Sequence, residues 1–369
     1  MNPSHLKFIR QDVQSMHAYA VQDSRGFVKL DAMENPYALP ADLQSKLGER
    51  LGKVAINRYP GARVEDLKAA LRDYAKVPAS YGLMLGNGSD ELISLLAMAC
   101  AATPGVALSQ AGAKILAPLP GFVMYAMSAQ LQGLPFIGVD LTADFELNEA
   151  AMLAAIDKEK PAITYLAYPN NPTANLWDAG VIKQIIAACA VYGGMVVMDE
   201  AYQPFSSKSW MDEIKAAPAQ NANVLLMRTL SKFGLAGVRL GYMTGPLALI
   251  NEIDKLRPPY NISVLNAECA LFALENSESF RAQAAMITAQ RAVLLEALAK
   301  MPRLLAYPSD ANMITVRTPD ADAAFAHLKA QGILVKNISK MHPLLKNCLR
   351  LTVGTPDENT KMLAALRDI

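Results

Sequence analysis

The stretches Met195-Val-Val-Met-Asp-Glu-Ala-Tyr202 and Val224-Leu-Leu-Met-Arg-Thr-Leu-Ser-Lys232 each run from apolar residues into a polar tail. Apolar runs without alternation are typical of strands that helices cover on both faces of a sheet. The helical pattern over 179–192 ends at Gly193-Gly194, directly before the first run. In open α/β sheets the ligand site lies beyond the carboxyl ends of the strands, so both polar tails are candidates for one site.

Helix and strand patterns alternate outward from these two runs. Helical periodicity and apolar runs predict helices at 64–76, 91–102, 123–131, 149–158 and 247–256, and strands at 114–117, 136–139 and 163–167. Such alternation predicts an α/β fold whose mainly parallel sheet is flanked by helices.

Pro258-Pro259 interrupts this alternation. Beyond it the patterns predict helices at 264–275, 280–300, 321–331 and 358–367, and strands at 313–316, 333–335 and 349–353. We therefore expect a large domain over 41–258 and a smaller C-terminal α+β domain over 259–369. The segment 1–40 is poor in periodic pattern, and we expect it to cross the two domains.

Composition excludes several classes of protein. Of the 369 residues, 52% are hydrophobic and only 19% charged, which excludes a disordered chain or a coiled coil. The net charge of +1 gives no basic excess for nucleic acid. The first twenty residues lack a signal-peptide pattern, and the longest apolar stretch, Leu92–Ala102, is too short to span a membrane. We expect a soluble cytoplasmic protein with neither nucleic-acid nor membrane partners.

The four cysteines, Cys100, Cys189, Cys269 and Cys348, are far apart in the sequence. None forms a C-x-x-C pair, so we expect no metal site. Most lie in apolar patterns, and we interpret them as core thiols in a reducing compartment.

Lys232 and Asp199 are the candidate catalytic residues. A lysine amine whose charge is suppressed can form a Schiff base with an aldehyde cofactor, although taken alone Lys232 is better interpreted as a surface lysine on a loop. Asp199 ends a buried apolar run, where an unpaired carboxylate is costly. It could cap a helix or turn, or it could hold the pyridine nitrogen of a cofactor in its protonated form.

Gly86-Asn87-Gly88-Ser89-Asp90-Glu91 precedes an apolar helical pattern. The first N–H groups of a helix could bind a phosphate, although an ordinary capped helix start has the same pattern. Thr229, Ser231 and Arg239 could donate to the same phosphate. Phe122 could stack on a flat ring or belong to the core. Glu91 stands where a dinucleotide fingerprint needs glycine or alanine, which disfavours a dehydrogenase.

Taken together, these motifs resemble one family. Thr229–Tyr242, Asn-Asn-Pro-Thr (170–173) and Asp-Glu-Ala-Tyr (199–202) look like the fold-type-I aminotransferases, which use pyridoxal phosphate. Three further segments, 29–36, 57–61 and 348–356, resemble the histidinol-phosphate aminotransferase branch of that family. The resemblance covers about residues 15–369, with the motifs in the same order.

The resemblance implies a role for each matching residue. Lys232 would be the Schiff-base lysine and proton shuttle, and Asp199 would pair with the pyridinium. Asn171 and Tyr202 would hydrogen-bond the ring hydroxyl, and Phe122 would stack on the ring. The phosphate would be held by Ser89, Asp90, Thr229, Ser231 and Arg239, and by Tyr59 from the other subunit of a homodimer. The residues at the substrate would be Tyr19, Asn35, Lys336 and Arg350.

The sequence departs from the family pattern at four places. Position 174 is alanine where glycine is frequent, so we expect this loop to avoid positive φ. Phe122 stands where many relatives have tyrosine, and only seven residues separate Lys232 from Arg239 instead of eight, which could shift the arginine. Lys336 replaces an arginine of some relatives and loses its bidentate geometry.

The implied reaction moves the amino group of L-histidinol phosphate to 2-oxoglutarate, giving imidazole-acetol phosphate and L-glutamate in histidine biosynthesis. Two alternatives share the cofactor residues and stay open here: an aromatic amino-acid aminotransferase and a threonine-phosphate decarboxylase. A cofactor-binding transcription regulator is disfavoured, because the segment before Tyr19 is too short for a helix-turn-helix and the net charge is only +1.

Overall fold

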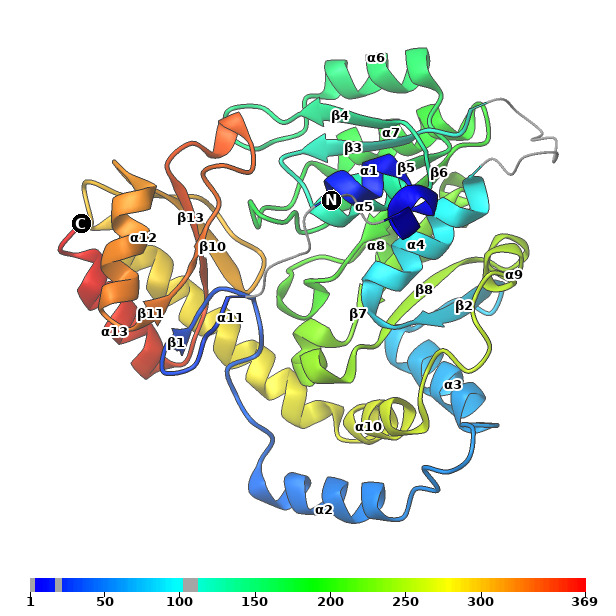
Figure 1. Ribbon diagram of the computed structural model, residues 1–369, viewed down its shortest axis with the longest axis horizontal. Coiled ribbons are helices and arrows are strands. Elements are labelled where there is room, and N and C mark those ends of the chain that lie inside the picture. The colour runs from blue at the N-terminus through cyan, green and yellow to red at the C-terminus, as the bar shows by residue number, and fades with distance from the viewer. Residues whose placement is uncertain (1–3, 17–21, 102–111) are drawn as a thin grey trace.

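A computed structural model describes residues 4–16, 22–101 and 112–369 of the chain (Figure 1). Its main sheet has seven strands in the order β2-β8-β7-β6-β5-β3-β4. Among these strands only β8 runs opposite to the direction that the other six share, which confirms the mainly parallel sheet. The strands are β2 (Tyr81–Gly86), β3 (Ile115–Leu119), β4 (Phe136–Asp140), β5 (Ile163–Ala167), β6 (Met195–Asp199), β7 (Val224–Thr229) and β8 (Gly241–Pro246).

Helices cover both faces of this sheet, which explains the unbroken apolar runs (Figure 1). Successive β6 side chains point to opposite faces: Val196 and Met198 join one core cluster, and Val197 joins another. The first cluster is covered by α6 (Glu149–Glu159), α7 (Ala179–Ala190) and α8 (Trp210–Ala216), and the second by α4 (Gly88–Cys100), α5 (Val123–Leu131) and α9 (Leu247–Asp254).

Several described elements have no counterpart in the sequence prediction, among them β2, β8, α8 and α2 (Ala41–Gly52). Both strands contain two glycines, a residue depleted in strands, so their composition hides them. The glycines allow close packing: an added Cβ on Gly245 would lie 2.4 Å from Leu225, and one on Gly82 2.7 Å from Ile250. The helix predicted at 91–102 begins earlier, at Gly88.

The C-terminal part of the chain forms an antiparallel sheet in the order β12-β13-β10-β9. These strands are β9 (Leu305–Ala306), β10 (Met313–Arg317), β12 (Lys336–Asn337) and β13 (Cys348–Thr352). They pack against α11 (Ser277–Ala299), α12 (Ala321–Ala330) and α13 (Pro356–Leu366). The long helix α11 runs from this sheet to α10 (Val264–Glu275), which packs on α3 (Arg63–Ala75) beside the main sheet (Figure 1).

The described part of the N-terminal segment contacts elements of both the C-terminal part and the main-sheet part of the chain. After α1 (Gln11–Ser15), β1 (Val28–Lys29) pairs in parallel with β11 (Ile333–Leu334). Nearer the start of the chain, Arg10 donates to the carbonyl oxygen of Leu131 at the end of α5, at 2.7 Å. The division of the chain into domains at residues 40 and 258 stays a prediction.

The close approach of β8 to α4 gives a test of the fold. An added Cβ on Gly241 would lie 2.7 Å from the backbone carbon of Gly88, which cannot move without shifting the start of α4. We expect Gly241→Ala to lower the free energy of unfolding by ~1–3 kcal/mol, measured by denaturant titration. Gly237→Ala is the control, because its Cβ would meet nothing within 4 Å. Equal stability of the two variants would contradict this contact.

Candidate active site

A cavity of about 140 Å³ lies at the carboxyl ends of β5, β6 and β7. We call it the central cavity. The structure brings together here every cofactor-site residue predicted within one chain. Its lining comprises Met33, Ser89, Asp90, Phe122, Tyr125, Ala167, Pro169, Asn171, Asp199, Ala201, Tyr202, Thr229, Ser231, Lys232 and Arg239.

Asp199 is the last residue of β6, and its carboxylate is buried at one end of the cavity. The hydroxyl of Tyr125 donates to Oδ2 at 2.7 Å, and the main-chain N–H of Ala201 donates to Oδ1 at 3.0 Å. Burial raises the pKa of Asp199 to about 6, although both hydrogen bonds oppose this shift. The carboxylate can therefore stabilise a buried positive charge brought in by a ligand.

Lys232 lies in the turn after β7. Its Nζ donates to the carbonyl oxygen of Ala32 at 3.1 Å and lies 5.8 Å from the ring centroid of Tyr202. Burial, together with the positive charge of Arg350, lowers the pKa of Lys232 to about 8. A neutral amine is thus accessible near physiological pH, which is the form that attacks a carbonyl carbon.

The other end of the cavity is rich in donors. Thr229 donates from Oγ1 to Ser231 Oγ at 2.9 Å, and Arg239 donates from Nη1 to the same oxygen at 3.3 Å. The start of α4 lies beside them, and its first N–H groups have no partner within the helix. Gly88 has φ +75°, and an added Cβ there would lie 2.7 Å from Arg239 Nη2. This cradle of donors suits an anion such as a phosphate.

Arg350 of β13 connects the C-terminal sheet to the cavity. It donates from Nη1 to Asn171 Oδ1 and from Nη2 to the carbonyl oxygen of Asp31, both at 2.9 Å. Lys336 of β12 stands directly opposite Arg350 in the antiparallel register, so the two cations project from the same face of the sheet.

Five predicted residues are absent from the lining of the central cavity: Arg350 contacts it through Asn171, Lys336 lies beside Arg350 on β12, and the other three are Tyr59, Asn35 and Tyr19. Tyr59 is 75% exposed and its ring stacks on Tyr260 at 4.3 Å. Asn35 donates to Gln283 of α11 at 2.8 Å and is not part of the cavity lining. Tyr19 lies outside the described residues.

The structure contradicts one expectation about the loops, the φ of Ala174, and shows that another, a displaced Arg239, does not apply. Ala174 does adopt positive φ, at +67°, contrary to the prediction. The cost is offset by hydrogen bonds at both of its peptide groups: Ala174 N to Asn170 O at 2.9 Å, and Asp310 N to Ala174 O at 2.7 Å. The seven-residue spacing leaves Arg239 in the cavity lining, where its own φ is +54°.

Tyr125 and Met33 are cavity residues that sequence reasoning missed. Tyr125 lies three residues after Phe122, which places both aromatic rings on one side of the start of α5. This spacing was the available signal for Tyr125. Met33 has φ +52° and reaches the cavity from the N-terminal segment, for which the local sequence gives no signal.

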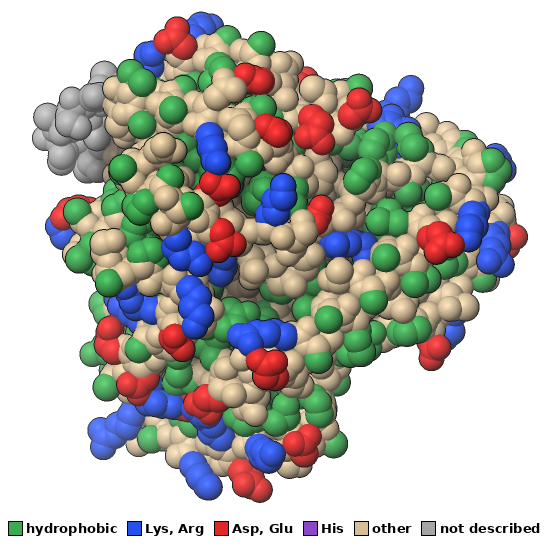
Figure 2. Space-filling model, turned by 180° about the vertical axis from the view of Figure 1, so that it is seen from behind, with side chains coloured by type: hydrophobic (Ala, Val, Ile, Leu, Met, Phe, Trp, Pro, Cys, Tyr) green, Lys and Arg blue, Asp and Glu red, His purple; other side chains and the backbone are tan. Residues whose placement is uncertain are grey.

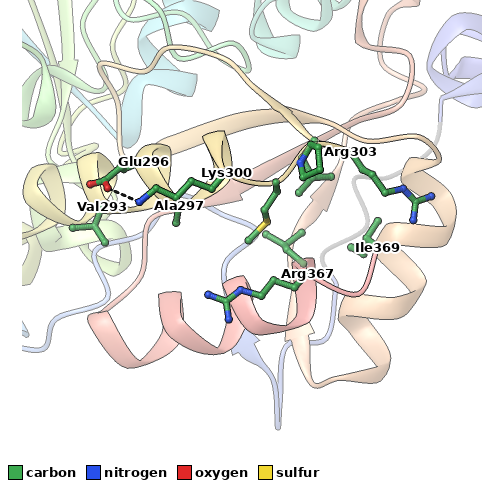
Figure 3. A pocket seen from close by; sticks show the side chains of 11 residues that line it. Val293, Glu296, Ala297, Lys300, Arg303, Arg367 and Ile369 are labelled. Atoms are coloured by element: carbon green, nitrogen blue, oxygen red, sulfur yellow. Dashed lines mark hydrogen bonds and ion pairs between the residues drawn. The ribbon is translucent and has the colours of Figure 1, made fainter.

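The remaining described surface offers weaker candidates. A hollow of about 580 Å³ between α11 and α13 is larger, but Figure 3 shows its Lys300 paired with Glu296, and its lining contains no serine, threonine, cysteine or histidine. Basic and acidic side chains are interspersed over the face in Figure 2. Within the described residues no group of acidic, histidine and cysteine side chains could hold a metal, and no helix is long and apolar enough to cross a membrane.

The central cavity fits pyridoxal phosphate. A lysine with a suppressed charge shares the cavity with a buried carboxylate and with a cradle of phosphate donors. Lys232 matches the aldehyde of this cofactor, Asp199 its pyridine nitrogen, and the cradle its phosphate. The Cβ that is missing at Gly88 keeps the cradle open beside Arg239.

In sequence, this chain resembles known aminotransferases. Residues 25–366 match the family model described as aminotransferase class I and II. A histidinol-phosphate aminotransferase of Polaromonas naphthalenivorans (strain CJ2) is 67% identical over 366 residues, which cover 99% of this chain and 97% of that protein.

Solved structures share the fold at lower identity. The histidinol-phosphate aminotransferase from Sinorhizobium meliloti in complex with pyridoxal-5′-phosphate aligns with a TM-score of 0.82 and 20% identity, over 98% of this chain and 97% of that one. The L-threonine-O-3-phosphate decarboxylase from Porphyromonas gingivalis aligns with a TM-score of 0.75 and 19% identity, over 92% and 98%. The fold alone therefore does not choose between these two reactions.

The fold and the central cavity define an enzyme that depends on pyridoxal phosphate. The extent of the family match narrows this class further: the chain belongs to the class I and II aminotransferase family.

The buried carboxylate predicts opposite effects on stability and on activity. A carboxyl whose folded-state pKa is raised weakens the fold as the pH rises through the window between its unfolded and folded pKa values. Since the pKa of Asp199 is about 6, we expect the Asp199→Asn apoprotein to be ~1–3 kcal/mol more stable than wild type at neutral pH, with no gain near pH 4. Thermal melts of the cofactor-free proteins across this range test the expectation.

The same substitution should slow the reaction by at least a hundredfold, because the loss of one partner of a buried charge pair typically costs ~3–5 kcal/mol. Asp144→Asn is the control, since Asp144 is exposed and outside the cavity. A folded Asp199→Asn enzyme with near-normal turnover would count against the assigned role of Asp199.

Proposed function

We propose that the enzyme transfers the amino group of L-histidinol phosphate to 2-oxoglutarate, giving imidazole-acetol phosphate and L-glutamate. The observation that carries the proposal is the pair of cations Arg350 and Lys336, side by side on the sheet face from which Arg350 reaches the central cavity. A phosphorylated amine and a dicarboxylate both need such cations. The full-length relative at 67% identity carries the same activity in its name.

The residues of the cavity divide the chemical work. Bound pyridoxal phosphate supplies an aldehyde for the amine and a ring that withdraws electrons from the substrate Cα. Lys232 then removes the proton from Cα and returns it, because burial keeps a useful fraction of its amine neutral near pH 8. Asp199 holds the charge of the ring nitrogen, and Asn171 and Tyr202 orient the ring through its hydroxyl.

Arg350 is the proposed shared anchor for both anionic substrates. Its planar fork matches carboxylate and phosphate oxygens alike. Two of its donors are held by Asn171 and by the carbonyl oxygen of Asp31, which fixes the guanidinium at the cavity rim. Lys336 adds a second charge as a point contact. We assign Tyr19 and Asn35 to the substrate as well, on the resemblance of their segments to the family.

We further propose that the enzyme is a homodimer in which Tyr59 completes the partner's phosphate site. Tyr59 stacks on Tyr260 at the surface, and both rings are more than half exposed. Ile56 and Leu265 add exposed apolar area near them in the sequence. A second copy of the chain would cover this area and give the Tyr59 hydroxyl a ligand.

The cytoplasm is the proposed setting. All four cysteines are free thiols, and Cys189 and Cys348 are buried in the core, which suits a reducing compartment.

The substrate assignment predicts a strong preference for the phosphorylated amine. Histidinol would deprive Lys336 of the phosphate that we propose it contacts, so its kcat/KM should be at least about tenfold lower than that of histidinol phosphate. Lys336→Ala should reduce kcat/KM for histidinol phosphate and leave that for histidinol nearly unchanged. Lys340→Ala is the matched control, because its side chain is almost fully exposed and pairs with Asp322.

The measurement is a panel of amines with 2-oxoglutarate that includes phenylalanine, tyrosine and threonine phosphate. Equal use of histidinol and histidinol phosphate would refute the phosphate anchor and favour an aromatic amino-acid aminotransferase. Release of CO₂ from threonine phosphate would favour the decarboxylase.

The shared site predicts complementation between two inactive variants. Lys232→Ala and Tyr59→Ala should each be nearly inactive as homodimers. Random mixing makes about half of the dimers mixed, and each mixed dimer has one site with neither defect, so about a quarter of all sites should be intact. Activity is measured after subunit exchange has been verified by mass spectrometry. If exchange occurs and no activity returns, Tyr59 does not act across the dimer.

A further inference from the structure

We infer that Tyr125 is a positioning residue that keeps the Asp199 carboxylate charged and aimed at the ring nitrogen of the cofactor. The inference rests on the proposed function. It is carried by one hydrogen bond, 2.7 Å from the Tyr125 hydroxyl to Asp199 Oδ2, in a fully desolvated environment.

The tyrosine ring is held in place from two sides. It stacks on Tyr165 with centroids 4.2 Å apart and planes at 6°, and it meets Phe122 edge-on at 5.6 Å. Tyr165 belongs to β5 and Phe122 precedes α5, so the ring is fixed between the sheet and the helix. Its hydroxyl therefore points at Asp199 without a further loss of side-chain freedom.

Tyr125 is, among the described residues, the only side-chain donor to Asp199. The Ala201 N–H takes Oδ1, and each carboxylate oxygen keeps a second lone pair that can face the cavity. Phe122 has no hydroxyl with which to compete for this role. A neutral phenol is the suitable donor here, since burial raises the pKa of Tyr125 well above its usual value.

The other charges around Asp199 disfavour its ionised form. Asp90 of α4 and the neighbouring Glu200 both raise the pKa of Asp199, as does burial. Glu200 is itself paired with Arg228 at 2.8 Å. The hydroxyls of Tyr165 and Tyr202, which lie near Asp199, are neutral because burial raises the pKa of each. Within this set the hydrogen bonds from Tyr125 and Ala201 favour the carboxylate, and only Tyr125 can be removed without altering the backbone.

The chain offers a matched control. Tyr165 is also fully buried and stacked in the same pair, but its hydroxyl has no hydrogen-bond partner within the described residues. Tyr165→Phe and Tyr125→Phe therefore each remove one buried oxygen from the same stacked pair, and only the second removes a donor to Asp199.

The experiment measures binding to the apoprotein rather than turnover. Pyridoxine 5′-phosphate is the probe, because it lacks the aldehyde and cannot bond to Lys232. We expect Tyr125→Phe to weaken its affinity about 10- to 100-fold near pH 7, since a hydrogen bond to a charged group is lost. The deficit should narrow as the pH rises, because Asp199 ionises at a higher pH in the variant. Calorimetric titrations across this range give both quantities, and Tyr165→Phe should follow wild type.

The outcomes separate this inference from the proposed function. If wild type does not bind pyridoxal 5′-phosphate, or if borohydride fixes it to a lysine other than Lys232, the proposed function is wrong. If wild type binds it at Lys232 while Tyr125→Phe shows no deficit, or a deficit that does not change with pH, the role of Tyr125 is wrong.

Two further measurements keep the inference testable should Tyr125→Phe fold poorly. Replacement of Tyr125 by 3-fluorotyrosine gives a more acidic donor of similar shape, and it should extend tight binding to lower pH. In an Asp199→Asn background the effect of Tyr125→Phe should largely vanish, because no carboxylate remains to be held charged. An unchanged effect in that background would overturn the inference.

Discussion

The chemistry of the central cavity depends on the burial of two opposite ionisable groups, Asp199 and Lys232. Loss of water disfavours the charged form of each, so the pKa of the carboxyl rises and the pKa of the amine falls. Neither charged group stabilises the folded protein in this arrangement. Both become useful once a ligand supplies a cationic ring for the carboxylate and a carbonyl carbon for the amine. Because the two charged groups do not stabilise the site themselves, the surrounding residues must keep it in place.

The surroundings that hold it are a second buried network at the same strand ends. Glu200 follows Asp199, and Arg228 precedes Thr229. Arg228 bonds Glu200 through Nε at 2.9 Å and Ser209 through Nη2 at 2.9 Å, and Glu200 also accepts from the main-chain N–H of Trp210. This pair ties the end of β6 to the end of β7, so the catalytic carboxylate and the loop that carries the lysine keep a fixed separation. Removal of one member would leave a buried charge unpaired.

The C-terminal sheet supplies what the main sheet lacks, a pair of cations that we propose binds anionic substrates. β10, β13 and β12 place Thr315, Arg350 and Lys336 in one row across the sheet. Thr315 donates to the carbonyl oxygen of Pro172 at 2.7 Å, and Arg350 donates to Asn171, so the row lies against the loop that closes the cavity. The central cavity and the residues proposed to select the substrate thus belong to different sheets that meet at residues 171–172, an arrangement in which the same scaffold can serve several reactions.

Much of this arrangement could be predicted from the sequence. The apolar runs at 195–198 and 224–227 are buried on both faces, because a parallel sheet between helix layers requires that pattern. The motifs around Lys232, Asp199 and Asn171 were sufficient to place one site at the carboxyl ends of the strands. β2 and β8 escaped prediction because their glycines serve close contacts with β7, α4 and α9 that local propensity does not encode.

By itself, then, the sequence determined the α/β class, the family and the residues that the structure gathers at the central cavity, since each depends on local pattern and residue type. Only the tertiary structure decided which distant groups share a contact. It joined Tyr125 to Asp199, Arg350 to Asn171 and Lys232 to the carbonyl oxygen of Ala32. It also allowed Ala174 a positive φ that its residue type disfavours. These outcomes depend on hydrogen bonds and packing between segments far apart in the chain, and no local pattern contains them.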